Sequence, residues 1–295
     1  MQTRLCAATA LTLVLTGCGG ADHAATAGVV HVVAGENSWG DIIRQISGSR
    51  VTVTSIISDP NADPHTYETD PKDAAAISAA SFVVLNGVGY DDFASKLLAA
   101  SPRTSRTVLT IATVVGVTGG NPNPHLWYDP AYVTAAATSI ASHLAAVDPV
   151  HSKAFQANLQ AFLAAYQPYV ETLENIKQKY GGTEIAYTER VPGYLVRAAG
   201  LVLGTPASFA QSIEDGNDPS PADTAAMDDA MRHRTVKVLL YNAQVTSPVT
   251  DKVKSLATAS GLPVVGVSET IPQQYRDFQT WQIAQAKAIL AALGG

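Results

Sequence analysis

The 295-residue chain is poor in the residues that several common kinds of protein chemistry require. It has two cysteines, and Cys6 lies in an apolar amino-terminal segment that we expect to be removed. Removal would leave Cys18 alone, which excludes a disulfide framework and a thiolate metal site. Charged residues make up only 15% of the chain, and no stripe of Lys and Arg with aromatic residues is present, so no nucleic-acid partner is expected.

Familiar catalytic signatures are also lacking. The chain has no His-Glu-x-x-His segment, no Gly-x-Ser-x-Gly elbow and no glycine-rich phosphate loop. These absences argue against a zinc hydrolase, a serine hydrolase and a nucleotide-binding enzyme, and we predict that the protein is not an enzyme.

The amino terminus has the pattern of an export signal. A short basic start, Met1 to Arg4, precedes the apolar run Leu5 to Leu15, which is too short to span a bilayer as a permanent helix. The run ends in Leu15-Thr16-Gly17-Cys18, which resembles the lipobox of bacterial lipoproteins. We therefore predict a signal peptide over 1–17, lipid on Cys18, a flexible tether over 18–27, and a location on the extracytoplasmic face of the membrane in the cell envelope. A plain secretory signal with an incidental cysteine is the alternative.

The rest of the chain alternates β-branched runs with helical patterns. This rhythm is typical of α/β proteins, in which crossover helices join parallel strands. We predict two lobes of similar topology, 28–147 and 182–295, joined by one long rigid helix over 148–181 that Pro168 can kink. The expected strands cover 28–34, 51–57, 82–85, 107–111, 184–188, 207–213, 236–241 and 263–267.

Two histidines directly follow prolines in similar settings. His65 lies in Asp63-Pro64-His65-Thr66-Tyr67-Glu68, and His125 lies in Asn123-Pro124-His125-Leu126-Trp127. Proline fixes the local backbone, and a pre-shaped loop suits a metal ligand because coordination tolerates little positional error. Either histidine alone has the pattern of an ordinary turn residue, and it is the pair that indicates a shared site.

Potential ligands also follow strands of the second lobe. Open parallel sheets bind ligands beyond the carboxyl ends of their strands, where Glu189 and Glu269 lie. With His65 and His125 they form a candidate site of two imidazoles and two carboxylates in the cleft between the lobes. Such donors suit Mn²⁺ or Zn²⁺. Asp63, Glu68 and Asp129 flank the histidines, either as partners of the imidazoles or as solvated loop charges.

The chain resembles the solute-binding proteins of zinc and manganese ABC importers over essentially all of its length after the signal. The resemblance is carried by the two histidine motifs and by Asn86-Gly87, Thr188-Glu189-Arg190-Val191-Pro192-Gly193-Tyr194, Asn217-Asp218-Pro219-Ser220-Pro221 and Val267-Ser268-Glu269.

The resemblance implies a monomer that captures one Zn²⁺ or Mn²⁺ ion and delivers it to a membrane permease driven by an ATPase. The family's four ligand positions fall on His65, His125, Glu189 and Glu269; the last is usually aspartate. Two carboxylates that each bind through both oxygens suit Mn²⁺, whereas Zn²⁺ binds most sites of nitrogen and oxygen more tightly, so both metals stay open. A metal-dependent hydrolase and a metal-containing surface adhesin are the alternative functions.

Overall fold

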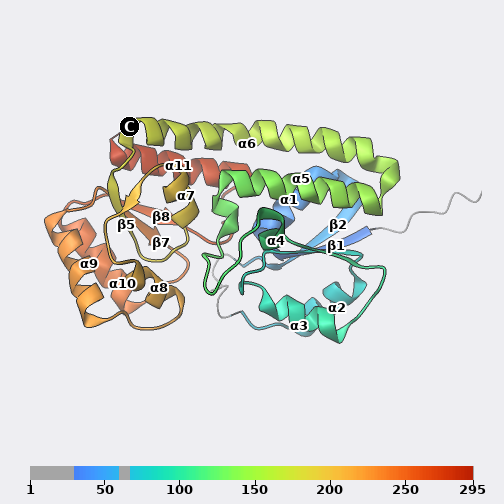
Figure 1. Cartoon of the computed structure of the whole chain (residues 1–295), viewed down its shortest axis with the longest axis horizontal. Helices are drawn as coiled ribbons and strands as arrows, with labels where there is room; N and C mark the ends of the chain where they lie inside the picture. The colour runs from blue at the N-terminus through green and yellow to red at the C-terminus, as the bar shows by residue number, and fades with distance from the viewer. Residues whose placement is uncertain (1–29, 60–66, 295) are drawn as a thin grey trace, which may run out of the picture.

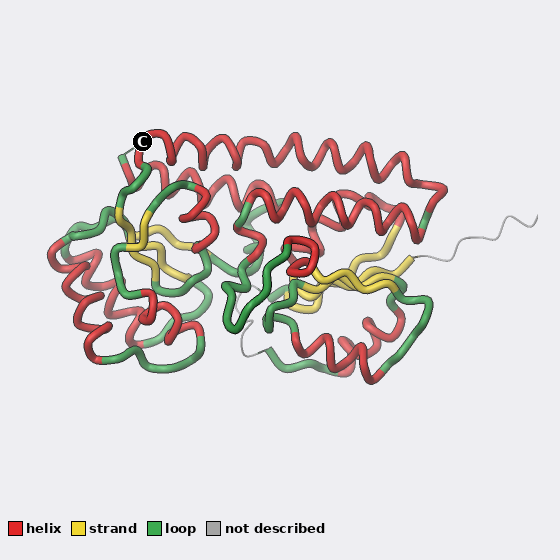
Figure 2. Tube along the Cα trace, viewed as in Figure 1, coloured by secondary structure: helices red, strands yellow, loops and turns green. Residues whose placement is uncertain are grey.

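The computed structural model describes residues 30–59 and 67–294. It contains two α/β lobes that lie side by side beneath one long helix (Figures 1 and 2). The predicted signal, the tether, the lipidation residue Cys18 and the proposed ligand His65 fall outside the described residues.

The amino-terminal lobe is built on a four-stranded sheet. All of its strands are parallel, in the order β2-β1-β3-β4. The strands are β1 (Val30–Glu36), β2 (Val51–Ile57), β3 (Phe82–Leu85) and β4 (Thr107–Thr110).

Both faces of this sheet are covered by helices, which explains why its central strands are apolar on both sides. Val32 and Ala34 of β1 belong to the main core, and Val33 belongs to a smaller cluster on the opposite face. One face carries α1 (Asn37–Ser47), α4 (Ile111–Val115) and α5 (Pro130–Val147), and the other carries α2 (Pro71–Ala79) and α3 (Asp92–Ala100) (Figure 1).

The carboxy-terminal lobe repeats this plan. Its four parallel strands have the order β6-β5-β7-β8, which is the order of the first lobe with each strand number raised by four. They are β5 (Glu184–Tyr187), β6 (Val202–Leu203), β7 (Leu239–Asn242) and β8 (Val264–Val267). The helices are α7 (Gly193–Ala198), α8 (Ala207–Glu214), α9 (Pro221–His233), α10 (Pro248–Ala259) and α11 (Phe278–Leu293). The prediction of two lobes with parallel sheets and similar topology is confirmed.

One predicted element of this lobe is wrong. Residues 207–213 were expected to form a strand, and they form helix α8. Phe209, Ala210 and Ile213 are its buried apolar residues, which is the spacing of one helical face. The strand in this region is instead the short edge strand Val202–Leu203, which pairs with β5.

The predicted long helix is present as α6 (Ser152–Tyr180), 29 residues long, and it passes over both lobes (Figure 1). It begins later than predicted, because Pro149–His151 form a separate 3₁₀ turn. Pro168 lies inside α6, and the Thr172 hydroxyl donates a hydrogen bond of 2.7 Å to the Pro168 carbonyl. The division into 28–147, 148–181 and 182–295 stays a prediction.

Side-chain amides join the lobes on the helical side. Asn37 donates to the Ile271 carbonyl at 3.2 Å, and its oxygen accepts the Ile271 amide at 2.9 Å. Gln45 and Gln279 exchange hydrogen bonds of 2.9 and 2.7 Å. These four contacts fix α1 of one lobe against the α11 region of the other.

Within residues 30–59 and 67–294, no helix has both the length and the apolar character needed to cross a bilayer.

Candidate metal centre

His125 is fully buried, and a side chain two residues earlier fixes its orientation. The Asn123 side-chain oxygen accepts the backbone amide of His125 at 3.0 Å and lies 2.7 Å from its Nδ1. The side-chain nitrogen of Asn123 donates a hydrogen bond of 2.7 Å to the Arg190 carbonyl, so the oxygen of the Asn123 side chain must be the atom that faces the histidine. Nδ1 therefore carries a proton, and Nε2 is the nitrogen directed away from Asn123.

Glu269 follows β8 and lies directly opposite His125. It is fully buried, and its Oε2 lies 3.2 Å from Nε2 of His125. The Tyr90 hydroxyl donates to the same oxygen at 2.8 Å. An imidazole nitrogen and a carboxylate oxygen at this distance need a proton or another cation between them. The contact thus joins one residue of each lobe at a position suited to a positive charge.

Tyr90 reaches Glu269 from a tight turn after β3. Gly87, Val88 and Gly89 all have positive φ values, and the +50° of Val88 is unusual for a β-branched residue. The Tyr90 ring packs edge-on against the His125 ring, with ring centroids 5.7 Å apart. This turn places a hydroxyl donor inside the candidate site.

Glu189 follows β5 and is 1% exposed. Its Oε2 accepts a hydrogen bond of 3.0 Å from the side-chain nitrogen of Asn242, which also donates to Oε1 of Glu269 at 2.8 Å. Asn242 ends β7, between the strands that precede the two glutamates. A single amide therefore links both predicted carboxylates.

The structure thus places two of the four predicted ligands, one from each lobe, in direct contact and links a third to them through a side-chain amide. His125 and Glu269 are in contact, and Glu189 joins them through Asn242. In the described part of the chain, no three His, Cys, Asp or Glu side chains lie close enough to hold an ion by themselves. A cavity of about 190 Å³ lies next to this group, lined by Tyr90 and Pro124 from one lobe and Arg190 and Glu214 from the other.

Sequence reasoning missed four polar residues of the site: Tyr90, Asn123, Asn242 and Gln244. Gln244 accepts the backbone amides of Glu269 and Thr270, the latter at 2.9 Å. The rule that found the glutamates, polar residues at the carboxyl ends of strands, also points to Asn242. The side chain of Asn242 is an amide, which is not a common ligand of these metals, so its residue type gives no signal of a metal site.

The acidic residues flanking the histidines have other roles or lie at the surface. Asp129 caps α5 through the amides of Ala131 and Tyr132 and pairs with Arg197 at 2.7 Å. Glu68 is exposed, and Asp63 lies outside the described residues. Asp129 therefore acts as a helix cap and ion-pair partner.

The other described histidines are apart from this group. His31 and His233 are exposed, the His143 ring stacks on Phe82 at 5.6 Å, and His151 pairs with Asp148 at 2.6 Å.

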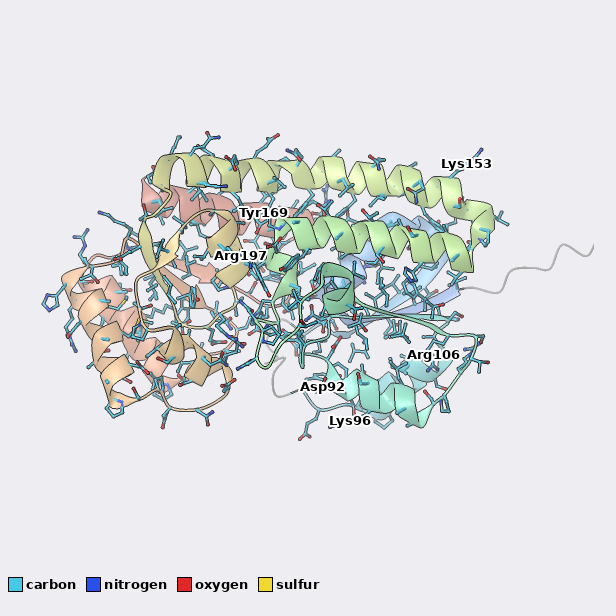
Figure 3. All side chains as sticks on the ribbon, viewed as in Figure 1. Asp92, Lys96, Arg106, Lys153, Tyr169 and Arg197 are labelled. Atoms are coloured by element: carbon cyan, nitrogen blue, oxygen red, sulfur yellow. The ribbon has the colours of Figure 1, made fainter. Side chains whose placement is uncertain are left out.

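The Asp129–Arg197 pair permits a prediction about stability. Arg197, labelled near the junction of the lobes in Figure 3, is 59% exposed, so the ion pair is screened by solvent. Arg197→Met keeps the apolar stem beside Tyr194 and should lower the free energy of unfolding by about 0.5–1 kcal/mol. Asp129→Ala should cost about 1 kcal/mol more, because the helix cap is also lost. Urea unfolding measures both; equal losses would contradict the assignment.

Arg190 fixes the loop before His125 to the second lobe. Its guanidinium donates to both oxygens of Glu214, at 2.6 and 3.0 Å, and to the Asn121 carbonyl at 3.2 Å. The Tyr194 hydroxyl donates to the Asn123 carbonyl at 2.9 Å. Glu189 immediately precedes Arg190, so these contacts set the position of His125 relative to Glu189.

Two further carboxyl groups, those of Glu36 and Asp91, are buried near the carboxyl end of β1 in the first sheet. Burial and the nearby Asp91 raise the pKa of Glu36 well above its usual value. Burial raises the pKa of Asp91 to about 6, although its carboxylate accepts the amides of Asn86 and Gly87. A side chain at Gly35 would place its Cβ 2.9 Å from the Asp91 carboxylate, so this approach requires glycine.

Two α/β lobes of equal topology, one long connecting helix and a buried polar site between the lobes define a two-lobed solute-binding protein. The family model described as the periplasmic component A of the zinc-uptake complex matches residues 32–292, and the chain belongs to this family.

Individual relatives agree with this assignment. The chain is 25% identical over 275 residues to the manganese ABC transporter substrate-binding lipoprotein PsaA of Streptococcus mitis, with 85% of this chain and 84% of the relative covered. It superimposes on a crystal structure of ZnuA with a TM-score of 0.73, at 23% identity over 90% of this chain and all of that one. The Mn²⁺ complex of FpvC from Pseudomonas aeruginosa gives a TM-score of 0.74, at 22% identity over 90% of this chain and 98% of that one. The two structural likenesses show the fold.

Proposed function

We propose that this chain captures one Zn²⁺ or Mn²⁺ ion outside the cytoplasm and delivers it to an ABC importer. The observation that carries the proposal is the buried contact of His125 with Glu269, joined through Asn242 to Glu189, in a protein of the zinc-uptake family. The family is one of substrate-binding transport components, which supports a binding function over a hydrolase. The surface adhesin alternative has no observation in its favour.

The charge of the proposed ligand set suits a buried divalent cation. Two carboxylates balance the two positive charges, and neutral imidazoles add none, so the complex is uncharged where water is excluded. We propose His65 as the fourth ligand, from the same lobe as His125. A permease and its ATPase, and anchoring through lipid on Cys18, complete the proposal, and the relative PsaA is itself named a lipoprotein.

Metal uptake by the purified protein tests the proposal. Metal-stripped protein should bind one Zn²⁺ or Mn²⁺ per chain in calorimetry and elemental analysis. At a free metal concentration a thousand times the Kd, the native state should gain about 4 kcal/mol by mass action. His125→Ala should abolish the gain, whereas His233→Ala, a matched change at an exposed histidine, should keep it. A wild-type protein that neither takes up metal nor gains stability would refute the function.

The contact of Asn123 with His125 gives a second prediction. Asn123→Ala removes the acceptor that orients the imidazole and breaks the link to the Arg190 carbonyl. Loss of such a partner costs about tenfold to a hundredfold in metal affinity. Competition titration against a chelator measures the change. The exposed Asn217 provides a matched control, and equal affinities of Asn123→Ala and Asn217→Ala would contradict the role of Asn123.

A further inference from the structure

We propose that the Tyr128 hydroxyl pre-organises the candidate metal centre by tying the segment that carries His125 to the segment that carries Glu269. The inference rests on the proposed function, and Tyr128 acts in it as a positioning residue. The hydroxyl lies 2.7 Å from the carbonyl oxygen of Ser268, the residue that immediately precedes Glu269. Both Tyr128 and Ser268 are buried, and the contact between them crosses from the first lobe to the second.

The first-lobe end of this contact is joined rigidly to His125. Leu126–Tyr128 form one 3₁₀ turn, in which the Tyr128 amide donates to the His125 carbonyl at 3.1 Å. The Tyr128 carbonyl accepts a hydrogen bond of 3.0 Å from the hydroxyl of Tyr169 on α6 (Figure 3). The Tyr128 ring packs edge-on against Trp281 of α11, with ring centroids 5.8 Å apart. The hydroxyl therefore has a fixed position relative to His125.

The second-lobe end is fixed as well, next to Glu269. The backbone amide of Ser268 donates to Oε1 of Gln285 on α11 at 3.2 Å, and the Ser268 hydroxyl accepts the Trp281 indole N–H at 3.0 Å. Oε1 of Gln285 also lies 2.7 Å from the Tyr128 hydroxyl, which has a single proton to donate. Both acceptors belong to the second lobe, so the proton joins the two lobes in either case.

The hydroxyl is a donor in surroundings that exclude water. Burial raises the pKa of Tyr128 well above its ordinary value, so the group stays protonated at neutral pH. A buried acceptor that lost this donor would be left unpaired, which is unfavourable. Segments that are held together in advance lose less freedom when an ion binds, so such a contact raises affinity without touching the ion. Tyr128 thus helps to hold Nε2 of His125 and Oε2 of Glu269 3.2 Å apart.

Tyr128→Phe tests the inference, because it removes the hydroxyl and keeps the ring beside Trp281. We expect the affinity for Zn²⁺ or Mn²⁺, whichever the wild type binds more tightly, to fall by at least about fivefold, the lower end of the cost of an unpaired buried group. Tyr169→Phe removes only the bond to the Tyr128 carbonyl and should lower the affinity less. Competition titration of the metal-stripped proteins against a chelator measures the affinities.

Tyr241→Phe is the matched control for a merely structural effect. The Tyr241 hydroxyl donates 2.8 Å to Asp251 within the second lobe, so this variant also loses one hydrogen bond of a buried tyrosine. Urea unfolding should show similar losses of stability in Tyr128→Phe and Tyr241→Phe, whereas Tyr241→Phe should keep the metal affinity within about twofold of wild type, since it breaks no contact between the lobes.

The difference in affinity between these two variants is decisive. Equal affinities of Tyr128→Phe and Tyr241→Phe would overturn the inference while leaving metal binding intact. A wild type that binds neither Zn²⁺ nor Mn²⁺ would refute the proposed function itself, and the inference with it. Tyr169→Phe carries the same comparison where Tyr128→Phe does not fold.

Discussion

Glu269→Gln should lower the affinity for Zn²⁺ by more than about a hundredfold, the upper end of the cost of losing a partner that only orients a ligand. The substitution keeps the size of the side chain and removes its charge. Oε1 accepts from Asn242, and Oε2 accepts from Tyr90 and lies beside His125, so the new amide nitrogen faces a donor or an imidazole in either orientation. Calorimetric competition with a chelator of known affinity measures the loss.

The same substitution, Glu to Gln, at an exposed position distinguishes the loss of a metal ligand from the general effect on affinity of removing one negative charge. Glu171 lies on α6 and is exposed, and Glu171→Gln should leave the affinity within about twofold of wild type. Comparable affinities of Glu269→Gln and wild type would remove Glu269 from the site.

Asp91→Asn should change how stability depends on pH between about pH 4 and pH 6. Burial raises the pKa of Asp91 from 3.8 to about 6, so in this interval the folded state holds a proton that the unfolded state has released. The stability contributed by the protonated carboxyl is fully present below pH 4 and is lost as pH rises through 6. Relative to Asp91→Asn, the wild type should lose roughly 3 kcal/mol across this interval, the value of a shift of about two pKa units.

The neighbouring Asp92 supplies the control for this experiment. It is exposed at the start of α3 (Figure 3), and its charge is the smallest of the causes that raise the pKa of Asp91, so Asp92→Asn should follow the wild-type pH dependence closely, with only a slightly lower midpoint. Urea unfolding of the metal-stripped proteins at several pH values gives the three curves. Parallel curves for wild type and Asp91→Asn would show that Asp91 has an ordinary pKa in the folded protein.

Much of the architecture was predictable because it depends on local pattern. The strands Val51–Ile57 and Phe82–Leu85 have the predicted bounds, since strong β-branched or apolar runs meet clear turn residues there. The prediction of a strand over 207–213 was wrong because the segment is short. Over seven residues, the spacing of Phe209 and Ile213 fits both the two-residue period of a strand and the 3.6-residue period of a helix.

The site was predictable only in part, and for a different reason. Glu189 and Glu269 follow strands, and the strand-end rule applies to any parallel sheet. Tyr90 reaches Glu269 from another lobe, 179 residues away in sequence, and Asn123 depends on a carbonyl 67 residues away. Contacts of this kind arise from the packing of the lobes, which no local pattern encodes. The ligand roles of His65, His125, Glu189 and Glu269 and the lipidation of Cys18 stay predictions.

Anomalous diffraction from crystals grown with Zn²⁺ or Mn²⁺ tests the central claim most directly. Data collected on either side of the metal's absorption edge locate the ion independently of any assumption about its ligands. We predict one strong peak per chain between the lobes, within about 2.0–2.2 Å of Nε2 of His125 and of a carboxylate oxygen of both Glu189 and Glu269, the usual distances for zinc. A peak elsewhere in the chain, with none between these three side chains, would contradict the account.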